Sequence, residues 1–559
     1  MNKEQFEKYN SIPREKFAFT TTSGSMHDQK LETKPVGYMR DAFRRFCKNK
    51  GSVVAAVIIL MLFLFAIFAP IFSQYTVSYR DGRYTKSRPK SHLAVALGLD
   101  FWDGCESKDL TQTMFEAYYG INKETGHEAV KNGEYENYKS TTVSDDGAER
   151  ITQKYKLRLD SIYSVGVIYK SLTVEEYTDI QEYQDRTGTR ILYPVVSKKE
   201  RLTSKLDSIS LGSSAQFQND DGYFWFKIDP ASLVKVGTAF QPVALKDENG
   251  NFINNYRKYS GLDKEGNPWD GYFSTVLMDD EVEAGERLYD YGIKDQTGYE
   301  VRIDYYEYYK YLHVQAGDGI KEPWFLFGTN AAGQDILTCL ASGARFSFLM
   351  AIAVSLVNMF VGAIYGAIEG YYGGTADIIM ERISDILGGI PMMIVLVLVR
   401  LHLREAGVSA TVLPVASVFL AFFATGWMGM AGTVRMQFYR FKNQEYVLAA
   451  RTLGARDWKI MWKHIFPNSL GTIVTSCVLV IPSFIFSESS LSYLGIIDLS
   501  TSNITSVGSM LANSQAHMTS APHIMFFPAL FICLLMLSFN LFGNGLRDAF
   551  NPSLRGSEG

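Results

Sequence analysis

The stretch FKNQEYVLAARTLGARDWKIMWKHIFPNSL, residues 441–470, decides the fold. It carries too many charges to lie in lipid, yet long apolar segments flank it on both sides. Gln444 to Leu453 contains no Gly or Pro and is rich in strong helix formers, which predicts a helix. Gly454 is expected to end that helix and to allow a sharp turn.

A second amphipathic run follows the turn. Its large apolar residues recur at helical spacing, and Pro467 is expected to stop it just before the next apolar segment. The apolar residues are Trp458, Met461, Trp462 and Ile465, and the cationic ones in the whole stretch include Arg451, Arg456, Lys459 and Lys463. The stretch therefore predicts a helix–turn–helix at a membrane surface, of a shape suited to a groove on a soluble partner.

The composition averages two unlike regions. The chain has 559 residues, room for two or three domains. Its mean hydropathy is −0.04, but residues 76–325 are polar whereas most of 345–545 is strongly apolar. The net charge of −4, without a basic cluster interleaved with aromatics, argues against nucleic-acid binding. The five cysteines have no metal-ligand spacing, and only Cys105 lies in the polar region, which therefore cannot hold an internal disulfide.

Six apolar segments are candidates to cross a membrane. A charge-free segment of this length can span the ~30 Å of hydrocarbon in a bilayer. A cleaved signal peptide is the alternative for the first one, but the long tail before it, its length and the lack of an A-x-A site disfavour that reading. The segments are 53–72, 346–368, 383–399 with Pro391 inside it, 406–434, 465–487 and 524–543.

The polar region is predicted to fold as an α+β domain. Alternating patterns predict strands at 155–159, 164–172 and 222–228, and residues 172–186 are typical of a helix. At ~250 residues the region is far longer than an ordinary loop and should have its own core.

Basic residues orient the predicted spans. The segment before the first span and the 441–470 stretch are rich in Lys and Arg, whereas the short outer loops hold only Arg400 and Arg404. By the positive-inside rule, 441–470 should lie in the cytoplasm and the polar region outside. The basic amphipathic segment from Met39 to Lys50 should lie on the inner membrane surface.

The spacing in the decisive stretch resembles a known motif. Ala449-Ala450, then Gly454, then twelve residues to Pro467 resembles the EAA loop of ATP-binding-cassette importer permeases. The string EYVLAARTLGA…HIFPN is similar to the dipeptide/oligopeptide permease branch. In that family the loop is the coupling helix that docks into a cytoplasmic ATPase. Leu448 stands at the usual acidic position, and an ordinary amphipathic hairpin is the alternative.

Two further strings support the resemblance. WFLFGTNAAGQDILTCLASGARFSF (324–348) is similar to the family signature before the second span, matching it at Gly328, Thr329, Gly333 and Asp335. We call these four residues the outer motif, and expect the segment to form a capped amphipathic helix on the outer surface. Asn330 and Gln334 replace an acid and an arginine, so any ion pair that those residues make in relatives is absent. The ending GNGLRDAFNP (543–552) also resembles the family, with Asn551 in place of an acid.

The sequence shows no catalytic motif. It contains no P-loop and no Gly-Lys pair, no H-E-x-x-H and no G-x-S-x-G, so no catalytic residue, metal ligand or bound cofactor is expected. Glu488 at the end of the fifth apolar segment is a candidate pathway residue, because a carboxylate near lipid is costly. Whether it faces the pathway or outer water stays open. Glycines in the spans are interpreted as close-packing positions rather than substrate contacts.

The resemblance covers 40–72 and 324–555 and implies a fold. That fold is a polytopic α-helical membrane protein, a type I ABC importer permease with six transmembrane helices and a large α+β extracellular domain between the first and second. The expected divisions are a disordered cytoplasmic tail (1–39), an amphipathic segment and first helix (40–74), the extracellular insert (75–325), the permease core (326–552) with its coupling loop (441–468), and a cytoplasmic tail (553–559).

The resemblance also implies a role: a plasma-membrane permease subunit of an importer for oligopeptides or dipeptides, with both termini cytoplasmic. The implied partners are a second homologous permease, two cytoplasmic ATPases that use ATP and Mg²⁺, an extracellular solute-binding lipoprotein and membrane lipid, with no nucleic acid. The implied coupling residues are Glu445, Tyr446, Ala449 and Ala450 for packing, Gly454 for the turn, Arg456 and Lys459 for acidic groove residues, and Pro467 and Asn468 for the exit into the membrane.

Other functions stay open from the sequence. The chain would also fit a sensor built on a permease scaffold, or an importer of another small solute such as nickel. The insert would fit a binding module, a docking site for the binding protein or an anchor in the cell envelope.

Overall fold

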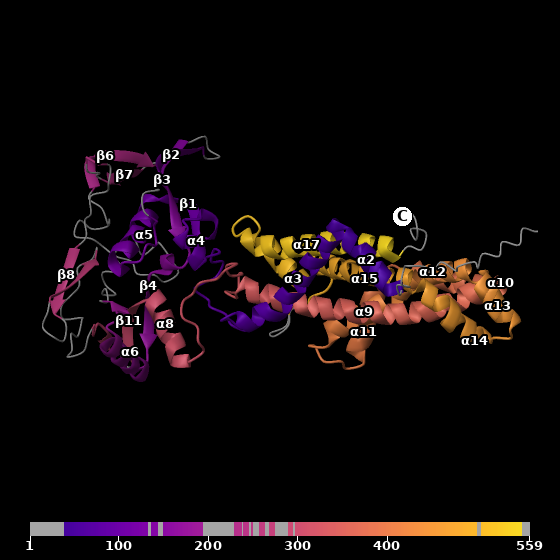
Figure 1. The fold of residues 1–559 in the computed structure, drawn as a ribbon. Coiled ribbons are helices and arrows are strands. Elements are labelled where there is room, and N and C mark those ends of the chain that lie inside the picture. The colour runs from indigo at the N-terminus through magenta and orange to yellow at the C-terminus, as the bar shows by residue number, and fades with distance from the viewer. Residues whose placement is uncertain are drawn as a thin grey trace, which may run out of the picture.

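The computed structural model places an elongated bundle of helices beside a separate α+β insert (Figure 1). The residues it describes are 38–131, 136–143, 149–193, 228–236, 239–244, 248–249, 257–262, 268–273, 289–294, 297–499 and 505–550. The predicted tails 1–39 and 553–559 therefore lie outside this part of the chain, apart from Tyr38 and Met39.

Five helices in the described chain are long and apolar enough to cross a membrane. They are α3 (Lys50–Phe72), α9 (Ile336–Tyr372), α12 (Leu413–Phe441), the continuous helix Asp457–Tyr493 and α17 (His523–Phe550). A sixth candidate is the pair α10 (Gly374–Gly388) and α11 (Met392–Glu405), bent by 77° at the break between them. The predicted interruption at Pro391 is confirmed, because this residue lies in that break, directly before the first residue of α11.

Shorter helices complete the bundle. The helix Asp457–Tyr493 is made of α14 (Asp457–Ile460), the π-helix η6 (Met461–Ile465) and α15 (Phe466–Tyr493). The remaining elements are α2 (Tyr38–Lys48), α13 (Glu445–Thr452), α16 (Val507–Ser514) and η7 (Gln515–His517). Within α2, Phe46 is buried edge-on against Phe542 of α17, whereas Phe43 is exposed.

The expectation of an amphipathic helix on the outer surface before the second span is wrong. The outer motif is a loop that leads directly into α9, a helix that starts ten residues before the predicted 346–368 and runs without interruption to Tyr372. Asp335 caps this helix, because its carboxylate accepts hydrogen bonds from the backbone N–H and the hydroxyl of Thr338 at 2.9 and 2.6 Å. α12 also differs from its prediction, since the positive φ of Gly407 (78°) belongs to a turn and the helix begins only at Leu413.

Glycines bring α9 and α12 together. A Cβ atom added to Gly362, Gly366 or Gly370 would lie 2.6, 2.1 or 2.7 Å from a backbone carbonyl oxygen of α12. Only glycine permits this approach, so the prediction that the glycines serve close helix packing is confirmed for these three.

The insert contains two main antiparallel sheets. One has the order β1-β3-β2, with β1 (Cys105–Thr111), β2 (Glu136–Val143) and β3 (Glu149–Asp160). The other has the order β10-β11-β4, with β5 paired to β11, from β4 (Val167–Leu172), β5 (Leu192–Tyr193), β10 (Ile293–Lys294) and β11 (Tyr299–Asp304). Two hairpins are formed by β6 (Ile228–Val236) with β7 (Ala239–Ala244) and by β8 (Arg257–Leu262) with β9 (Pro268–Phe273).

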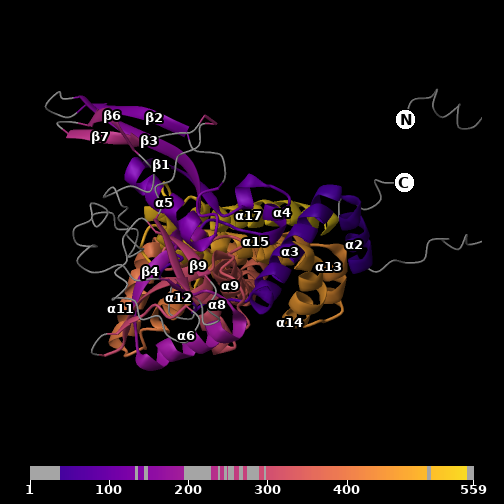
Figure 2. The same ribbon diagram turned by 90° about the vertical axis from the view of Figure 1, so that its left-hand side faces the viewer.

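Several short helices accompany these sheets. They are α4 (His92–Ala96), η2 (Asp100–Trp102), α5 (Gln112–Thr125), η3 (Tyr163–Val165), α6 (Val174–Thr187) and α8 (Tyr305–Ala316). β2, β3, β6 and β7 form one edge of the insert, and α6 lies at the opposite edge (Figure 2). Buried Tyr, Ile and Leu side chains form the cores beneath α6 and α8.

Most of the predicted elements of the insert are confirmed. The strand at 155–159 lies within β3, and the predicted helix at 172–186 is α6, whose N-terminus carries a capping box of Thr173 and Glu176. The strand at 164–172 is β4, preceded by the turn η3. The predicted strand at 222–228 lies outside the described residues except for Ile228, and Cys105 is unpaired as expected.

Candidate functional site

The helix–turn–helix predicted from residues 441–470 is formed by α13 and α14. It lies at the end of the bundle far from the insert (Figure 1). α13 ends in a Schellman turn, in which the N–H of Gly454 donates to the Arg451 carbonyl at 3.0 Å and that of Ala455 to the Ala450 carbonyl at 3.1 Å. Gly454 has a φ of +81° and open space around it. The predicted turn is confirmed, and backbone conformation rather than lack of room demands the glycine.

The prediction that Pro467 stops the second helix is wrong. The helix passes through Pro467 and continues to Tyr493. The π-helical turn η6 directly precedes the proline, and within it the N–H of Phe466 donates to the Met461 carbonyl. Because this wider turn shifts the hydrogen-bond register, a residue without an N–H is tolerated here. The second helix of the hairpin is therefore the direct start of a helix long and apolar enough to cross a membrane.

One face of the hairpin is fixed to the bundle. Val447, Ile460, Met461 and Ile465 are buried in one cluster with residues of α9, α12 and α15, among them Phe438. The buried side chain of Val447 attaches α13 to the bundle, and the other three attach the start of the long helix. At roughly 1.5–3 kcal/mol for each buried aliphatic side chain, this face fixes the hairpin rather than leaving it loose.

Polar contacts add to this attachment. The Tyr371 hydroxyl at the end of α9 donates to Asp457 Oδ1 at 2.5 Å and accepts from Arg451 Nη2 at 3.3 Å. Asn468 Nδ2 donates to the Tyr446 hydroxyl at 3.2 Å, which joins α15 to α13. Sequence reasoning missed Tyr371 and Asp457, because 86 residues separate them and neither belongs to a motif.

The opposite face of the hairpin is exposed and apolar. Leu453 is 87% and Trp458 63% exposed, and Leu448 and Tyr446 are also exposed. The predicted cationic residues Arg456 and Lys459 flank this face and are exposed as well. Large exposed apolar side chains rimmed by charge are typical of a surface that contacts another protein or a membrane.

The packing residues expected from the sequence lie differently within this chain. Of the four, Glu445, Tyr446 and Ala449 are exposed and Ala450 is half-buried. Pro467 and Asn468, expected at the exit into the membrane, are exposed as well. The residue of α13 that enters the core is Val447, which the sequence analysis did not single out.

A cluster of ion pairs stands beside the hairpin. Arg435 of α12 binds Asp377 of α10 at 2.7 Å, Glu381 at 2.8 Å and Glu369 of α9 at 3.5 Å. Tyr439 also donates to Asp377. The cluster joins three helices at the end of the bundle far from the insert (Figure 1). In the sequence this cluster is visible only as charged residues within or beside apolar segments. The basic ones were interpreted solely as indicators of membrane orientation.

A cavity of about 420 Å³ lies among α9, α12 and α15. It is lined without any charged side chain, and its polar groups are Asn358, Thr433, Ser476, Ser483 and Ser487. Gly429 lines it with open space, whereas Gly426 lies against Asn358, whose Nδ2 would be 2.2 Å from an added Cβ. The cavity offers hydrogen bonds and apolar contact but no fixed charge.

Glu488 lies elsewhere. It is 1% exposed, and its Oε1 accepts hydrogen bonds from Ser506 at 2.7 Å and Ser492 at 3.1 Å. Ser506 caps α16, so the carboxylate stands at the N-terminus of that helix, where a negative charge is favoured. Glu488 is therefore shielded from solvent and does not line the cavity among α9, α12 and α15.

The outer motif joins the bundle to the first residues of the insert. The Thr329 hydroxyl donates to the Tyr84 carbonyl at 2.5 Å and accepts from the Ser87 N–H at 2.8 Å. Gly328 and Gly333 have φ of +77° and +74°, and a Cβ would lie 2.4 Å from the Ser87 oxygen and 1.8 Å from the Asp81 oxygen. Burial raises the pKa of Asp335, despite its hydrogen bonds from Thr338, to about 6. All four residues therefore have structural roles at one junction.

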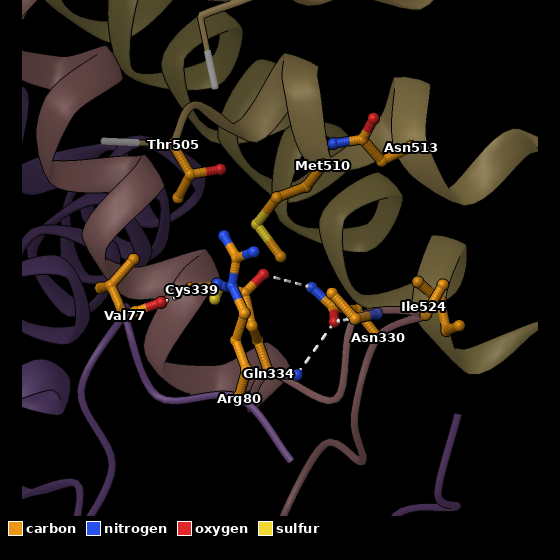
Figure 3. A pocket seen from close by; sticks show the side chains of 11 residues that line it. Val77, Arg80, Asn330, Gln334, Cys339, Thr505, Met510, Asn513 and Ile524 are labelled. Carbon is orange, nitrogen blue, oxygen red and sulfur yellow. Dashed lines mark hydrogen bonds between the residues drawn. The ribbon is translucent and has the colours of Figure 1, made fainter. Parts of the chain in front are cut away.

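The two substitutions in this motif form a neutral pair. Asn330 Nδ2 donates to Gln334 Oε1 at 3.0 Å, and Gln334 Nε2 donates to the Val77 carbonyl at 2.7 Å. Both side chains line a cavity of about 430 Å³ together with Arg80, and Thr505, Met510 and Asn513 face them from its other side (Figure 3). An amide pair thus stands where relatives were expected to have an ion pair.

Two regions of the bundle match known protein families. Residues 359–556 match the family described as binding-protein-dependent transport system inner membrane component, and 37–89 match the N-terminal TM domain of oligopeptide transport permease C. The oligopeptide transport system permease protein OppC of Bacillus subtilis (strain 168) is 40% identical over 235 residues, which is 42% of this chain and 73% of the relative. The dipeptide transport system permease protein DppC of the same strain is 38% identical over 231 residues, 41% and 69% of the two chains.

A solved structure of the MetNI methionine ABC transporter, in an inward-facing conformation, aligns with 38% of this chain and 96% of its own. The identity is 17% and the TM-score 0.32, too low to support an argument. The two family matches, at 37–89 and 359–556, leave most of the insert uncovered.

Proposed function

Because the chain belongs to the dipeptide/oligopeptide permease family of ABC transporters, we propose that it is a membrane subunit of an ATP-driven importer for oligopeptides or dipeptides. In this role it forms half of the translocation pathway and receives mechanical work from cytoplasmic ATPases. The chain itself supplies no catalytic site, and ATP and Mg²⁺ are used by the ATPase partners.

One observation carries the proposal: the α13–α14 hairpin has a fixed face and a free face. Val447, Ile460 and Ile465 hold it in the bundle, while Leu453 and Trp458 stand in solvent. Since α14 continues into α15 without a break, a force on the free face is transmitted along a helix that crosses the membrane. This is the arrangement that a coupling element requires.

The uncharged cavity supports peptide cargo. Hydroxyl and amide groups can hydrogen-bond to a peptide backbone, which every peptide shares, without selecting side chains by charge. In this subunit α9, α12 and α15 form one wall of the pathway. A second, homologous permease would form the facing wall. A solute-binding lipoprotein would deliver the peptide from outside.

The proposed topology has six spans, with α10 and α11 forming one broken span. Both termini and the coupling loop 441–468 would be cytoplasmic, and the insert 75–325 extracellular. Two features support it: the hairpin and the insert lie at opposite ends of the bundle (Figure 1), and basic residues concentrate on the hairpin side.

The decisive experiment measures ATP hydrolysis by the purified complex in proteoliposomes with and without peptide-loaded binding protein. We expect an ATPase to copurify and its hydrolysis to rise with peptide. A complex without a nucleotide-hydrolysing subunit would refute the proposal.

A matched pair of glycine variants tests coupling itself. Gly454→Val should abolish transport while membrane insertion persists, because a β-branched residue at φ +81° deforms the turn. Gly407→Val is the control, since Gly407 also has a positive φ (78°) with open space but lies outside the hairpin. Equal transport by the two variants would contradict the coupling role.

A further inference from the structure

A loop of the insert, residues 91–102 (SHLAVALGLDFW), projects from a closed base; we call it the apolar hook. The Ser91 N–H donates to the Trp102 carbonyl at 3.0 Å, and the Gly104 N–H donates to the Pro89 carbonyl at 2.9 Å. Lys90 and Asp103 form an antiparallel bridge between these bonds. Because both ends of the loop are fixed together, its shape is built into the fold.

The side chains on the hook are apolar and exposed. Between Leu93 and Leu99 there is no polar side chain, and Ala94 is the one buried residue of that run. Five large side chains are 40 to 70% exposed: Leu93, Val95, Leu97, Leu99 and Phe101. A continuous apolar patch of this size marks an interaction surface.

The carboxylates at the end of the hook form ion pairs with basic residues of the insert. Arg158 binds Asp100 Oδ1 at 2.7 Å and Asp103 Oδ2 at 2.6 Å, and Lys131 binds Asp103 Oδ2 at 2.8 Å. Asp100 of the hook and Asp103 directly after it are thus paired with basic residues of the insert, whereas the apolar side chains of the hook are exposed. The hook is thereby two-sided, as an amphipathic membrane-surface element is.

Aromatic contacts place the hook at the end of a membrane-spanning helix. Trp102 lies on Phe527 of α17, with ring centroids 6.1 Å apart, and its indole N–H donates to the Leu326 carbonyl at 2.5 Å. Phe527 in turn meets Phe526, an exposed residue. Both ribbon views show α4 beside the insert-side end of α17 (Figures 1 and 2). Tryptophan and other aromatics gather at this level of a membrane, where apolar rings meet polar headgroups.

We propose that the apolar hook enters the interfacial layer of the bilayer around α17 and anchors the insert to the membrane surface. Continuity favours lipid as the occupant: Phe526 begins a row of exposed apolar residues along α17, continued by Leu530, Leu534 and Leu537. A protein partner is disfavoured because the run from Leu93 to Leu99 offers no side-chain hydrogen bond, whereas protein interfaces usually carry several. The inference depends on the membrane location of α17 and is independent of the cargo.

Photo-crosslinking in the full chain tests this. p-Benzoyl-phenylalanine is incorporated at Leu97 in one variant and at Val174 in another, and both are irradiated in proteoliposomes of phosphatidylethanolamine and phosphatidylglycerol and in native membranes. Val174 is the matched control, because it is an exposed aliphatic residue of the same insert at the first turn of α6, away from the bundle (Figure 1). Adducts are identified by mass spectrometry.

The expected result is a lipid adduct at position 97 in several-fold higher yield than at position 174, in both preparations. A protein adduct at position 97 in native membranes in place of the lipid adduct would overturn the proposal in favour of a protein partner. Equal lipid yields at the two positions would overturn it as well. Since both side chains are exposed, neither variant is expected to disturb folding, and failure here leaves the proposed transport function untouched.

Discussion

Gly333 and Gly454 have nearly the same backbone conformation, with φ of +74° and +81°, at opposite ends of one bundle. Around Gly333 the chain fills all space, with the Asp81 carbonyl 1.8 Å from where a Cβ would stand. A Cβ added to Gly454 would meet nothing within 4 Å. The junction at Gly333 is therefore filled by the chain itself, whereas the hairpin at Gly454 is open to its surroundings.

The difference extends to the residues nearby. Thr329 and Asp335 at the outer junction are buried and hydrogen-bonded within the chain. Leu453 and Trp458 of the hairpin are large, apolar and exposed. A glycine of similar backbone conformation thus lies in a packed junction at one end and in a proposed docking surface at the other. Only the residues around each glycine distinguish the two sites.

The largest effect is expected at the outer junction. Gly333→Ala should destabilise the protein by on the order of 2 kcal/mol or more, since backbone strain and a clash with a backbone carbonyl add together. Membrane yield and thermal unfolding in detergent measure this. Gly319→Ala is the control, because Gly319 has a φ of +80° but open space. If both variants lost equal stability, crowding would not be what distinguishes the junction.

Removing the apolar free face of the hairpin should affect assembly and leave folding intact. Leu453→Asp is expected to weaken ATPase binding by on the order of 2 kcal/mol, as for a central interface residue, with the unfolding temperature unchanged. ATPase recovery on purification of the tagged permease measures it. Val174→Asp, on an exposed insert residue, should keep full recovery. Full recovery with Leu453→Asp would remove the docking role from this face.

A smaller effect is expected from the polar attachment of the hairpin. Tyr371→Phe removes the hydroxyl between Asp457 and Arg451 and should cost about 1 kcal/mol. A double-mutant cycle with Asp457→Asn separates this pair from other contacts, because residues in contact are not additive. Peptide-stimulated ATP hydrolysis and thermal unfolding are both measured for each variant of the cycle. Strict additivity would show that the two groups are not coupled.

The smallest effect concerns pH in the insert. Burial lowers the pKa of His127, but Asp304 at 3.3 Å and Glu307 at 3.9 Å outweigh burial and raise it above its ordinary value. A raised pKa in the folded state stabilises the fold while the histidine is protonated, and this contribution is lost as the pH rises through the raised pKa. Hydrogen exchange in β11 and α8, corrected for intrinsic rates, should therefore quicken as the pH rises above the ordinary pKa of histidine and through the raised pKa of His127.

The control for that measurement is His127→Gln, which cannot titrate. Its corrected exchange rates in the same segments should not change over this pH range. If wild type and variant behaved alike, the ion pair would contribute nothing to the insert.

Local signals made much of this structure predictable. The apolar segments, the Gly454 turn and the helix at 172–186 each depend on residues close together in the chain, and the structure contains them. The Pro467 prediction failed because a π-helical turn absorbs the proline, and no local residue announces such a turn. The prediction of an outer amphipathic helix failed because Asp335 directly caps α9.

The candidate site was only half predictable for the same reason. The motif located the hairpin, but it did not distinguish the buried Val447 from the exposed Leu448 beside it. That distinction depends on Phe438 and on residues of α9 and α15, which are distant in sequence. The contacts of Arg435 with Asp377, Glu381 and Glu369 likewise form only when three helices meet.

The sequence by itself determined which segments are apolar, where the chain turns and which family the core resembles, because hydrophobicity and backbone preference act over a few residues. Only the tertiary structure decided which face of the hairpin is free, that Glu488 is enclosed at the start of α16, and that the apolar hook stands beside α17. These outcomes depend on what packs against each residue, and packing partners come from distant parts of the chain.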